Sequence, residues 1–140
     1  MINDPETSPG FLLWHVTLRW QREIAAALAP LGLTHVQFVL LACTWWLNTH
    51  AETDPNQLTL ARQAGTDVKM TSQVLAKLEA KGLVRREVDP ADTRAKRLRV
   101  TDAGAALAQR SIGVVDTVDA AFFGPAPDRS ALMRQLAALR

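Results

Sequence analysis

The sequence of 140 residues has a single cysteine, Cys43, and no tyrosine. One cysteine excludes an intrachain disulfide framework and any metal site built from several thiolates. The three histidines are scattered, and no acidic residue lies at metal-ligand spacing from them. The nucleophile-elbow, Walker and dinucleotide-binding motifs are also missing. We therefore expect no enzyme, no metal site and no cofactor, and Cys43 is interpreted as an inert buried thiol within an apolar helix.

A run of about 18 uncharged apolar residues, the minimum for a membrane-spanning helix, is absent as well. The N-terminal segment MINDPETSPG has acids and prolines where a signal peptide has a basic segment and then an apolar one. The composition, 48% hydrophobic and 21% charged, is typical of a globular protein with a packed core. The expectation is one domain, residues 1–140, located in the cytoplasm and without membrane contact.

Net charge is low, +2 at pH 7, but it is distributed unevenly. Residues 69–99 hold nine Lys or Arg against four Asp or Glu, whereas the rest of the chain has more acids than bases. The basic part coincides with a predicted helix and hairpin. A helix with a polar tip beside a basic hairpin is the electrostatic pattern of a duplex DNA-binding protein.

Two predicted helices in this region form a helix-turn-helix. The first spans Leu58 to Ala64, with Thr59 as its expected cap and Gly65 as its end. The second follows the N-cap Asp67 and ends before Gly82. Its expected apolar stripe consists of Val68, Thr71, Leu75 and Leu78. The second helix of such a unit enters the major groove of DNA.

A short hairpin follows. Residues 84–88 and 96–101 alternate apolar and charged positions, and the polar loop of residues 89–95 joins them. The predicted fold class is therefore mainly α with a small β-hairpin wing, a winged helix-turn-helix over residues 34–101.

Apolar helices flank this lobe, and residues 10–33 and 102–140 are the predicted dimerisation segments. The helix of residues 10–29 is apolar on two faces, which a small domain cannot bury alone, so a partner chain is expected. A Thr34/Gln37 capping box predicts a buried helix from His35 to Leu47. A long helix over residues 102–123 and a short one after Asp128 complete the chain. Gly113 is expected at a close helix–helix approach, and residues 1–9 as a frayed tail.

The segment LAKLEAKGLVRREVDPADTRAKRLRVTDAG resembles the end of the recognition helix, the wing and the following helix in the MarR family of bacterial transcriptional regulators. Asp92-Thr93-Arg94 matches the D-x-R element of the wing, and residues 100–104 match the strand-to-helix junction. The resemblance covers most of the chain and is strongest over residues 58–104. It implies a homodimer with interleaved terminal helices, two DNA-binding lobes spaced for a pseudo-palindromic operator, and in most such families repression.

Ten residues are expected to contact double-stranded DNA. Side chains near the start of a recognition helix reach base edges, where Gln pairs with adenine, Lys with guanine and an apolar group with the thymine methyl. Arg at a wing tip suits a narrow minor groove, and Asp92 is expected to position it. The other wing cations should contact phosphates, and Arg99 either joins them or serves the hairpin. The expected residues are Lys69, Met70, Ser72, Gln73 and Lys77 for bases, Arg94 for the minor groove, and Lys96, Arg97, Arg85 and Arg86 for phosphates.

Four tryptophans are unusual in a chain of this length, and core or dimer packing is the favoured interpretation. The family resemblance implies a second one, in which a small aromatic or phenolic effector binds between the dimer helices and the DNA-binding lobe. The residues expected to line such a pocket are His15, Arg19, Trp45 and Trp46.

Two other functions remain open. A winged-helix module that binds protein instead of DNA would lack basic residues on the wing and recognition helix, and Lys69, Arg94, Lys96 and Arg97 argue against it. A small-molecule enzyme using the tryptophan-rich helices would need a nucleophile or an acid–base pair, which the sequence does not provide.

Overall fold

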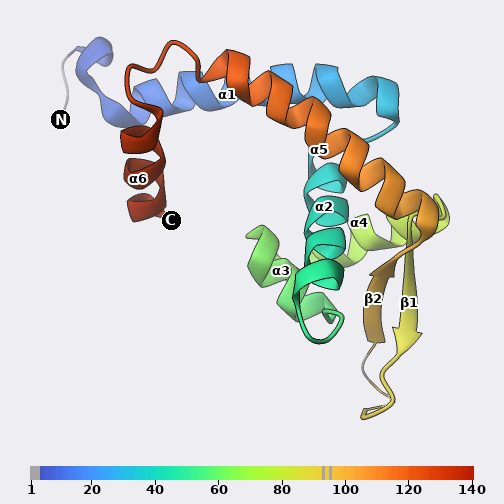
Figure 1. The fold of residues 1–140 in the computed structure, drawn as a ribbon. Helices are drawn as coiled ribbons and strands as arrows, with labels where there is room; N and C mark the ends of the chain where they lie inside the picture. The colour runs from blue at the N-terminus through green and yellow to red at the C-terminus, as the bar shows by residue number, and fades with distance from the viewer. Residues whose placement is uncertain (1–3, 93, 95) are drawn as a thin grey trace.

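The computed structural model describes residues 4–92, 94 and 96–140, so Thr93 of the D-x-R element and Ala95 of the predicted loop lie outside the described residues. Two long helices, α1 and α5, run side by side, and α2 descends from them into a lobe made of α3, α4 and the hairpin (Figure 1). Helix α6 follows the C-terminal end of α5 and lies on the same side of the molecule as the N-terminus (Figure 1). The elements are η1 Pro5–Thr7, α1 Pro9–Leu28, η2 Ala29–Leu31, α2 His35–His50, α3 Gln57–Ala64, α4 Val68–Ala80, β1 Val84–Val88, β2 Lys96–Val100, α5 Asp102–Phe122 and α6 Arg129–Leu139.

Local capping signals place most helix starts where the sequence predicts them. The Thr34/Gln37 capping box has both of its hydrogen bonds, and Asp67, Thr101 and Asp128 each accept a backbone amide as N-caps. Each side chain acts on an amide three residues away, so these bonds depend on sequence alone. The start of α4 is therefore fixed by Asp67 itself.

Three predicted boundaries are wrong. Residues 4–9 are not a tail, because Asp4 caps η1 and Ser8 caps α1 at Pro9. Helix α3 begins one residue earlier than expected, since the Asn56 side chain, not Thr59, is its cap. Helix α2 continues one turn beyond Leu47 to His50.

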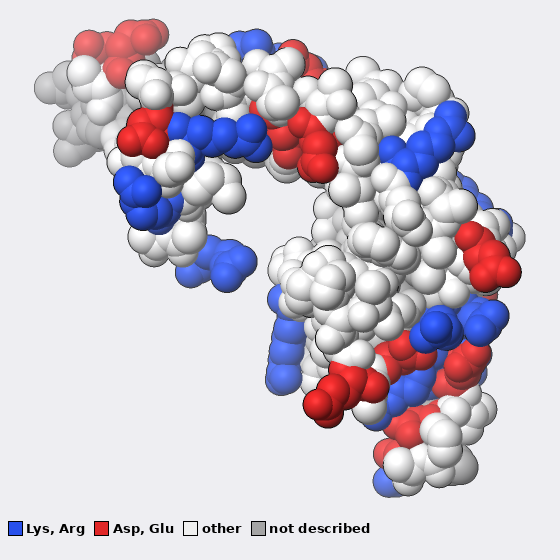
Figure 2. Space-filling view, viewed as in Figure 1, with Lys and Arg blue, Asp and Glu red and all other residues white. Residues whose placement is uncertain are grey.

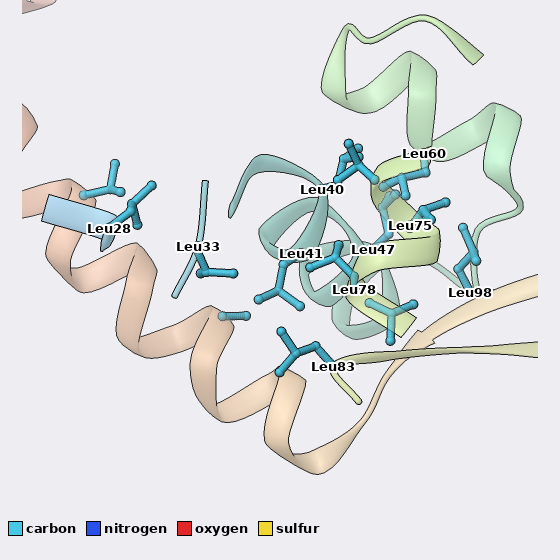
Figure 3. Packing of buried hydrophobic residues seen from close by; sticks show 14 of the residues in the cluster. Leu28, Leu33, Leu40, Leu41, Leu47, Leu60, Leu75, Leu78, Leu83 and Leu98 are labelled. Atoms are coloured by element: carbon cyan, nitrogen blue, oxygen red, sulfur yellow. The ribbon is translucent and has the colours of Figure 1, made fainter. Parts of the chain in front are cut away.

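The core is a continuous cluster of leucines centred on α2. It runs from Leu28 at the end of α1, past Leu41, to Leu75 and Leu78 on α4 and Leu98 on β2 (Figure 3). Each of these side chains is essentially inaccessible to solvent, and burying one stabilises the fold by about 1.5–3 kcal/mol. This cluster anchors the buried side of α4 and leaves its other side to solvent.

Glycine is required where the chain turns or where backbones touch. Gly82 follows α4 and has φ 74°, a left-handed conformation. Glycine adopts this conformation without steric strain because it has no Cβ. A Cβ at Gly104 would overlap the Leu83 carbonyl oxygen, so α5 begins against the turn between α4 and β1 only because this residue is glycine. No close helix–helix approach occurs at Gly113 within the chain, since a Cβ there would meet nothing within 4 Å among the described residues.

The hairpin pairs β1 and β2 in antiparallel register, with Val84 opposite Val100 and Arg86 opposite Leu98. Side chains of directly paired residues share a face of a sheet. One face therefore carries Val84, Arg86, Val88, Lys96, Leu98 and Val100, and the other carries Arg85, Glu87, Arg97 and Arg99. The first will be called the inner face because Val84 and Leu98 enter the core, and the second the outer face.

Among the helices of the described ranges, no single one has both the length and the apolar composition needed to cross a membrane. Helices α1 and α2 reach that length and composition only when taken together, and the chain bends by 72° between them.

Candidate nucleic-acid interface

The recognition helix α4 presents a polar, exposed face at its N-terminal half. Asp67 Oδ1 accepts the Met70 amide at 2.8 Å, and the buried Thr71 hydroxyl bonds to the Asp67 carbonyl oxygen and to Thr66. These contacts fix the first turn against the preceding turn of the chain. Of the predicted base-contact residues, Lys69, Met70, Gln73 and Lys77 are exposed, and Ser72 is half-buried. All five lie on one helix whose opposite face is in the core.

Val68 does not belong to the core stripe predicted for this helix. It is 53% exposed, and Val74 is buried in its place. The buried positions Thr71, Val74, Leu75 and Leu78 already follow the i, i+3, i+4, i+7 spacing of one helix face. That spacing is complete without Val68, which is the signal that could have identified Val68 as a surface residue.

The far end of α4 is tied to the junction of α1 and α2. Lys81, which follows α4, donates from Nζ to the Gly32 carbonyl oxygen at 2.6 Å and to Gln37 Oε1 at 2.9 Å. Gln37 Oε1 also accepts the Thr34 amide, as part of the capping box of α2. The orientation of the recognition helix is thus set at both ends, by Asp67 and by Lys81.

A cleft of about 360 Å³ lies between the start of α3 and the inner face of the hairpin. Its lining comes from Asn56, Gln57 and Leu58 at the start of α3 and from Arg86, Arg94, Lys96 and Leu98 of the hairpin. Three of these side chains are cationic, and no acid is among the described lining residues. The Arg86 Nε atom is buried without a hydrogen-bond partner, and its nearest charge partner is the Glu79 carboxylate of α4 at 3.7 Å. Such a cleft suits a phosphate of a nucleic-acid backbone.

Arg94 is almost fully exposed. Its side chain is 92% accessible, and Asp92 Oδ1 accepts both its backbone amide at 3.0 Å and, more loosely, its Nε at 3.5 Å. Asp92 therefore orients the loop around Arg94, as the sequence predicts, while the end of the guanidinium stays in solvent.

The cations of the outer face are paired within the protein. Arg97 donates to Asp89 Oδ2 at 2.8 Å and to the Asp54 carbonyl oxygen at 3.0 Å, and Arg99 contacts the Asp54 carboxylate at 3.0 Å. Arg85 pairs with Glu87 at 2.7 Å. The sequence-based expectation of a phosphate contact for Arg97 conflicts with this placement, because its guanidinium holds the base of the wing to the loop after α2. For Arg99 the structure favours the second expectation, in which its side chain holds the hairpin in place instead of contacting a phosphate.

Asp89 is buried at the start of the wing loop and remains charged. The Ala91 amide that donates to its Oδ1 holds the pKa of Asp89 below its usual value, the Arg97 guanidinium lowers it further, and burial opposes both. Figure 2 shows the consequence for the surface, where basic side chains of the hairpin are interspersed with acidic ones. The outer-face arginines thus have close carboxylate partners, whereas Arg86 on the inner face and Arg94 at the tip have only the longer contacts to Glu79 and Asp92, at 3.7 and 3.5 Å.

The four residues expected to line an effector pocket do not share a cavity in this chain. Arg19 lines a cavity of about 460 Å³ with Thr117, Val118 and Phe122, and its guanidinium lies 5.1 Å from the Phe122 ring centre. Trp45 lines another with outer-face arginines. His15 packs against Phe11, and Trp46 stacks on His50. The four side chains therefore do not meet in one of the cavities described for a single chain, and a pocket completed by a second copy of the chain stays a prediction.

Other candidates for chemistry are accounted for by packing. Trp20 donates from Nε1 to Asp119 Oδ1 at 2.9 Å and meets the His35 ring edge-on, which joins α1, α2 and α5. Burial lowers the pKa of His35, although the Asp119 charge opposes this shift. Cys43 is half-buried in α2, and burial raises the pKa of its thiol, so little reactive thiolate forms at neutral pH.

A helix-turn-helix with an exposed reading face and a basic hairpin beside it defines a winged-helix DNA-binding protein. The MarR family model matches residues 33–96. The chain is 43% identical over 122 residues to the HTH-type transcriptional regulator YdcH of Bacillus subtilis, covering 87% of this chain and 82% of that protein. The chain therefore belongs to the MarR family, and it is a DNA-binding transcriptional regulator.

Two solved structures of relatives agree with this assignment. Rv2887 of Mycobacterium tuberculosis in complex with salicylic acid has a TM-score of 0.73 at 32% identity, with all of both chains covered. CouR from Rhodococcus jostii RHA1 bound to p-coumaroyl-CoA has a TM-score of 0.83 at 25% identity, covering 99% of this chain and 92% of that one. By sequence, the HTH-type transcriptional repressor Rv2887 is 36% identical over 111 residues, 79% of this chain and 76% of that protein.

Proposed function

We propose that this regulator is a homodimeric repressor that binds a pseudo-palindromic operator and releases it when a small aromatic acid binds. The observation that carries the DNA-binding part is the cationic cleft between α3 and the inner face of the wing, next to the exposed face of α4. In this arrangement α4 enters the major groove, Arg94 enters the adjacent minor groove, and Arg86 and Lys96 contact the phosphates between them.

Dimerisation is supported by apolar surface on the terminal helices. On α1 the side chains of Leu13 and Trp14 are exposed, and on α6 so are those of Met133, Leu136 and Leu139. A cavity of about 260 Å³ lies between α1, the end of α5 and α6, and its lining is almost entirely apolar. A patch of this kind on a monomer marks an interaction site. A second copy of the chain would cover it and place two reading helices on one face of the dimer.

The DNA-binding proposal is tested by fluorescence anisotropy of a duplex from the upstream region of the gene, titrated at several salt concentrations. Binding should exceed that of a scrambled duplex and fall steeply with salt, because each neutralised phosphate adds about 0.9 to the slope of log K against log salt. Arg94→Ala and Lys96→Ala should weaken binding, and Lys96→Ala should reduce that slope by about 1 per protomer.

The matched control is Arg110→Ala, which removes the same charge from the exposed side of α5, outside the lobe. Equal losses in Arg110→Ala and Arg94→Ala would mean that net charge alone binds DNA and that the wing has no special role. Failure to bind any duplex would favour the protein-interaction module instead.

The effector part rests on relatives whose structures contain salicylic acid and p-coumaroyl-CoA. In this chain the Arg19 cavity offers the apolar Val118 and Phe122 for a ring and a cation for a carboxylate, which would have to replace the loose 4.0 Å contact of Arg19 with Glu23, another residue of the lining. We expect one of these two ligands to lower duplex affinity and to change tryptophan fluorescence, with both effects reduced in Arg19→Ala. If neither ligand changes either signal, ligand control by aromatic acids is wrong. An effector that acts this way must bind two states of the dimer with different affinity.

A further inference from the structure

Three large apolar side chains are exposed where α3 and α4 begin. Val68 is the first residue of α4 and Met70 the third, with exposed fractions of 53% and 42%, and Leu58, in the first turn of α3, is 48% exposed. The two helix starts are joined by a hydrogen bond from Gln57 Nε2 to the Val68 carbonyl oxygen at 3.2 Å. The exposed apolar groups therefore occupy adjoining first turns of the helix-turn-helix.

Folding does not account for valine at position 68. The buried stripe of α4 is complete without it, and the α4 cap is supplied by Asp67. A β-branched residue also has lower helix propensity than alanine. Any small or polar residue would satisfy the described contacts at this position equally well.

The charges around the first turn of α4 identify the class of molecule that covers it. Lys69 lies between Val68 and Met70 and is exposed, and the adjoining cleft carries Arg86, Arg94 and Lys96. A cationic rim around a small apolar group complements a polyanion that presents an apolar group at its surface. In the major groove of DNA, the 5-methyl group of thymine is that group.

We propose that Val68, together with Met70, reads thymine 5-methyl groups in each operator half-site, and so acts as a specificity-determining residue. This inference rests on the proposed function, because it places the first turn of α4 in the major groove. Lys69 and Gln73 supply the polar contacts to neighbouring bases, and Val68 supplies discrimination between thymine and cytosine at positions where hydrogen bonds do not reach.

The test removes methyl groups from the DNA and from the protein in turn. An operator is selected from a random-sequence duplex library with the wild-type protein, and each thymine is replaced singly by deoxyuridine, which lacks only the methyl group. At one or two positions per half-site the affinity should fall about three- to five-fold, the factor for one buried methyl-sized group. In Val68→Ala the substitution at the position read by Val68 should cause no further loss, while a loss at a position read by Met70 remains and the thermal stability of the protein stays unchanged.

Val88→Ala is the matched control, since Val88 is an equally exposed valine of the same lobe but lies on β1. It should keep the full deoxyuridine effect. The inference is overturned if no replacement changes affinity, if every loss persists in Val68→Ala, or if Val68→Ala changes the oligomeric state, which would make the patch a protein contact. Absence of binding to any duplex would overturn the proposed function as well, so the two failures are distinguishable.

Discussion

The DNA-binding lobe and the terminal helices use the same kinds of apolar residue in opposite ways. In the lobe, Leu41, Leu60 and Leu75 are completely buried by other parts of the same chain. On the terminal helices, Trp14 is 61% exposed and Leu139 82% exposed, and no residue of α6 is buried. The apolar side chains of the lobe are therefore buried within this chain, against α1 and α5 as well as against one another, whereas those of α6 and of the first half of α1 stay exposed, as the proposed dimer interface requires.

Polar interactions also differ between the two regions: those of the lobe link segments distant in sequence, whereas α6 has few contacts with the rest of the chain. Hydrogen bonds donated by two cationic side chains hold the edges of the lobe: Lys81 donates to the Gly32 carbonyl oxygen and the Gln37 side chain, and Arg97 donates to the Asp89 side chain and the Asp54 carbonyl oxygen. On the terminal helices the Trp20–Asp119 hydrogen bond joins α1 to α5, and the described contacts of α6 with the rest of the chain are few. This difference predicts that substitutions in the lobe change stability and that substitutions on the helices change assembly.

The largest effect is expected from the lobe core. Leu75→Ala should lower the free energy of unfolding by about 2–5 kcal/mol, because it removes buried methyl groups and leaves a cavity in a packed cluster. Urea denaturation followed by circular dichroism measures this change. Val68→Ala, on the exposed side of the same helix, is the control and should change the free energy by less than about 0.5 kcal/mol. Similar losses in both variants would contradict the inside–outside assignment of α4.

An intermediate effect is expected on the terminal helices. Leu13→Asp places a charge on the apolar surface of α1, and the variant should sediment as a monomer at concentrations where the wild-type protein is a dimer. Operator affinity should fall at least ten-fold, since one lobe then binds without its linked partner. Thr53→Asp adds the same charge to the exposed loop after α2 and should leave the dimer intact. A dimeric Leu13→Asp variant would remove the main support for the proposed interface.

Sequence reasoning succeeded in this molecule where the decisive contact is local. The N-caps Asp67, Thr101 and Asp128 act within three residues, and the left-handed glycines end their helices by backbone conformation alone. The winged-helix order of elements followed from these signals and from apolar spacing. Even the orienting role of Asp92 was predictable, because its partner Arg94 is two residues away.

Sequence reasoning failed where the partner is distant along the chain. Arg97 resembles any other wing cation until the fold brings the Asp54 carbonyl oxygen, 43 residues earlier, within 3.0 Å. The requirement for Gly104 likewise depends on Leu83, 21 residues earlier. Whether the predicted effector residues share a cavity likewise depends on how helices distant in sequence cross, which local sequence does not show. The sequence predicted the charge and exposure of the wing cations. It did not predict that those on the outer face of the hairpin are neutralised by acids of the same chain.

The smallest effect concerns the polar base of the wing. Because the Ala91 amide and Arg97 hold the pKa of Asp89 below its ordinary value of 3.8, the charged carboxylate stabilises the folded wing. The sign follows by linkage: this contribution is fully present above that value and is lost as the pH falls through the lower pKa of the folded state. The nuclear magnetic resonance signal of the Arg97 Nε–H group should therefore stay protected from solvent exchange from neutral pH down past 3.8, and lose protection only as the pH falls through the lower pKa of the folded state.

In Asp89→Asn the Arg97 signal should be weakly protected at every pH, because the charge-assisted bond is gone, while the leucine core and its unfolding free energy change little. Asp92→Asn removes an exposed wing carboxylate of the same loop and is the control, which should leave the Arg97 signal as in the wild-type protein. Protection in Asp89→Asn equal to that of the wild type would mean that Asp54 alone holds Arg97. The contact of Arg97 with the Asp54 backbone carbonyl would then anchor the wing to the loop after α2. This anchor would be independent of pH, as is the packing of the leucine core of the lobe.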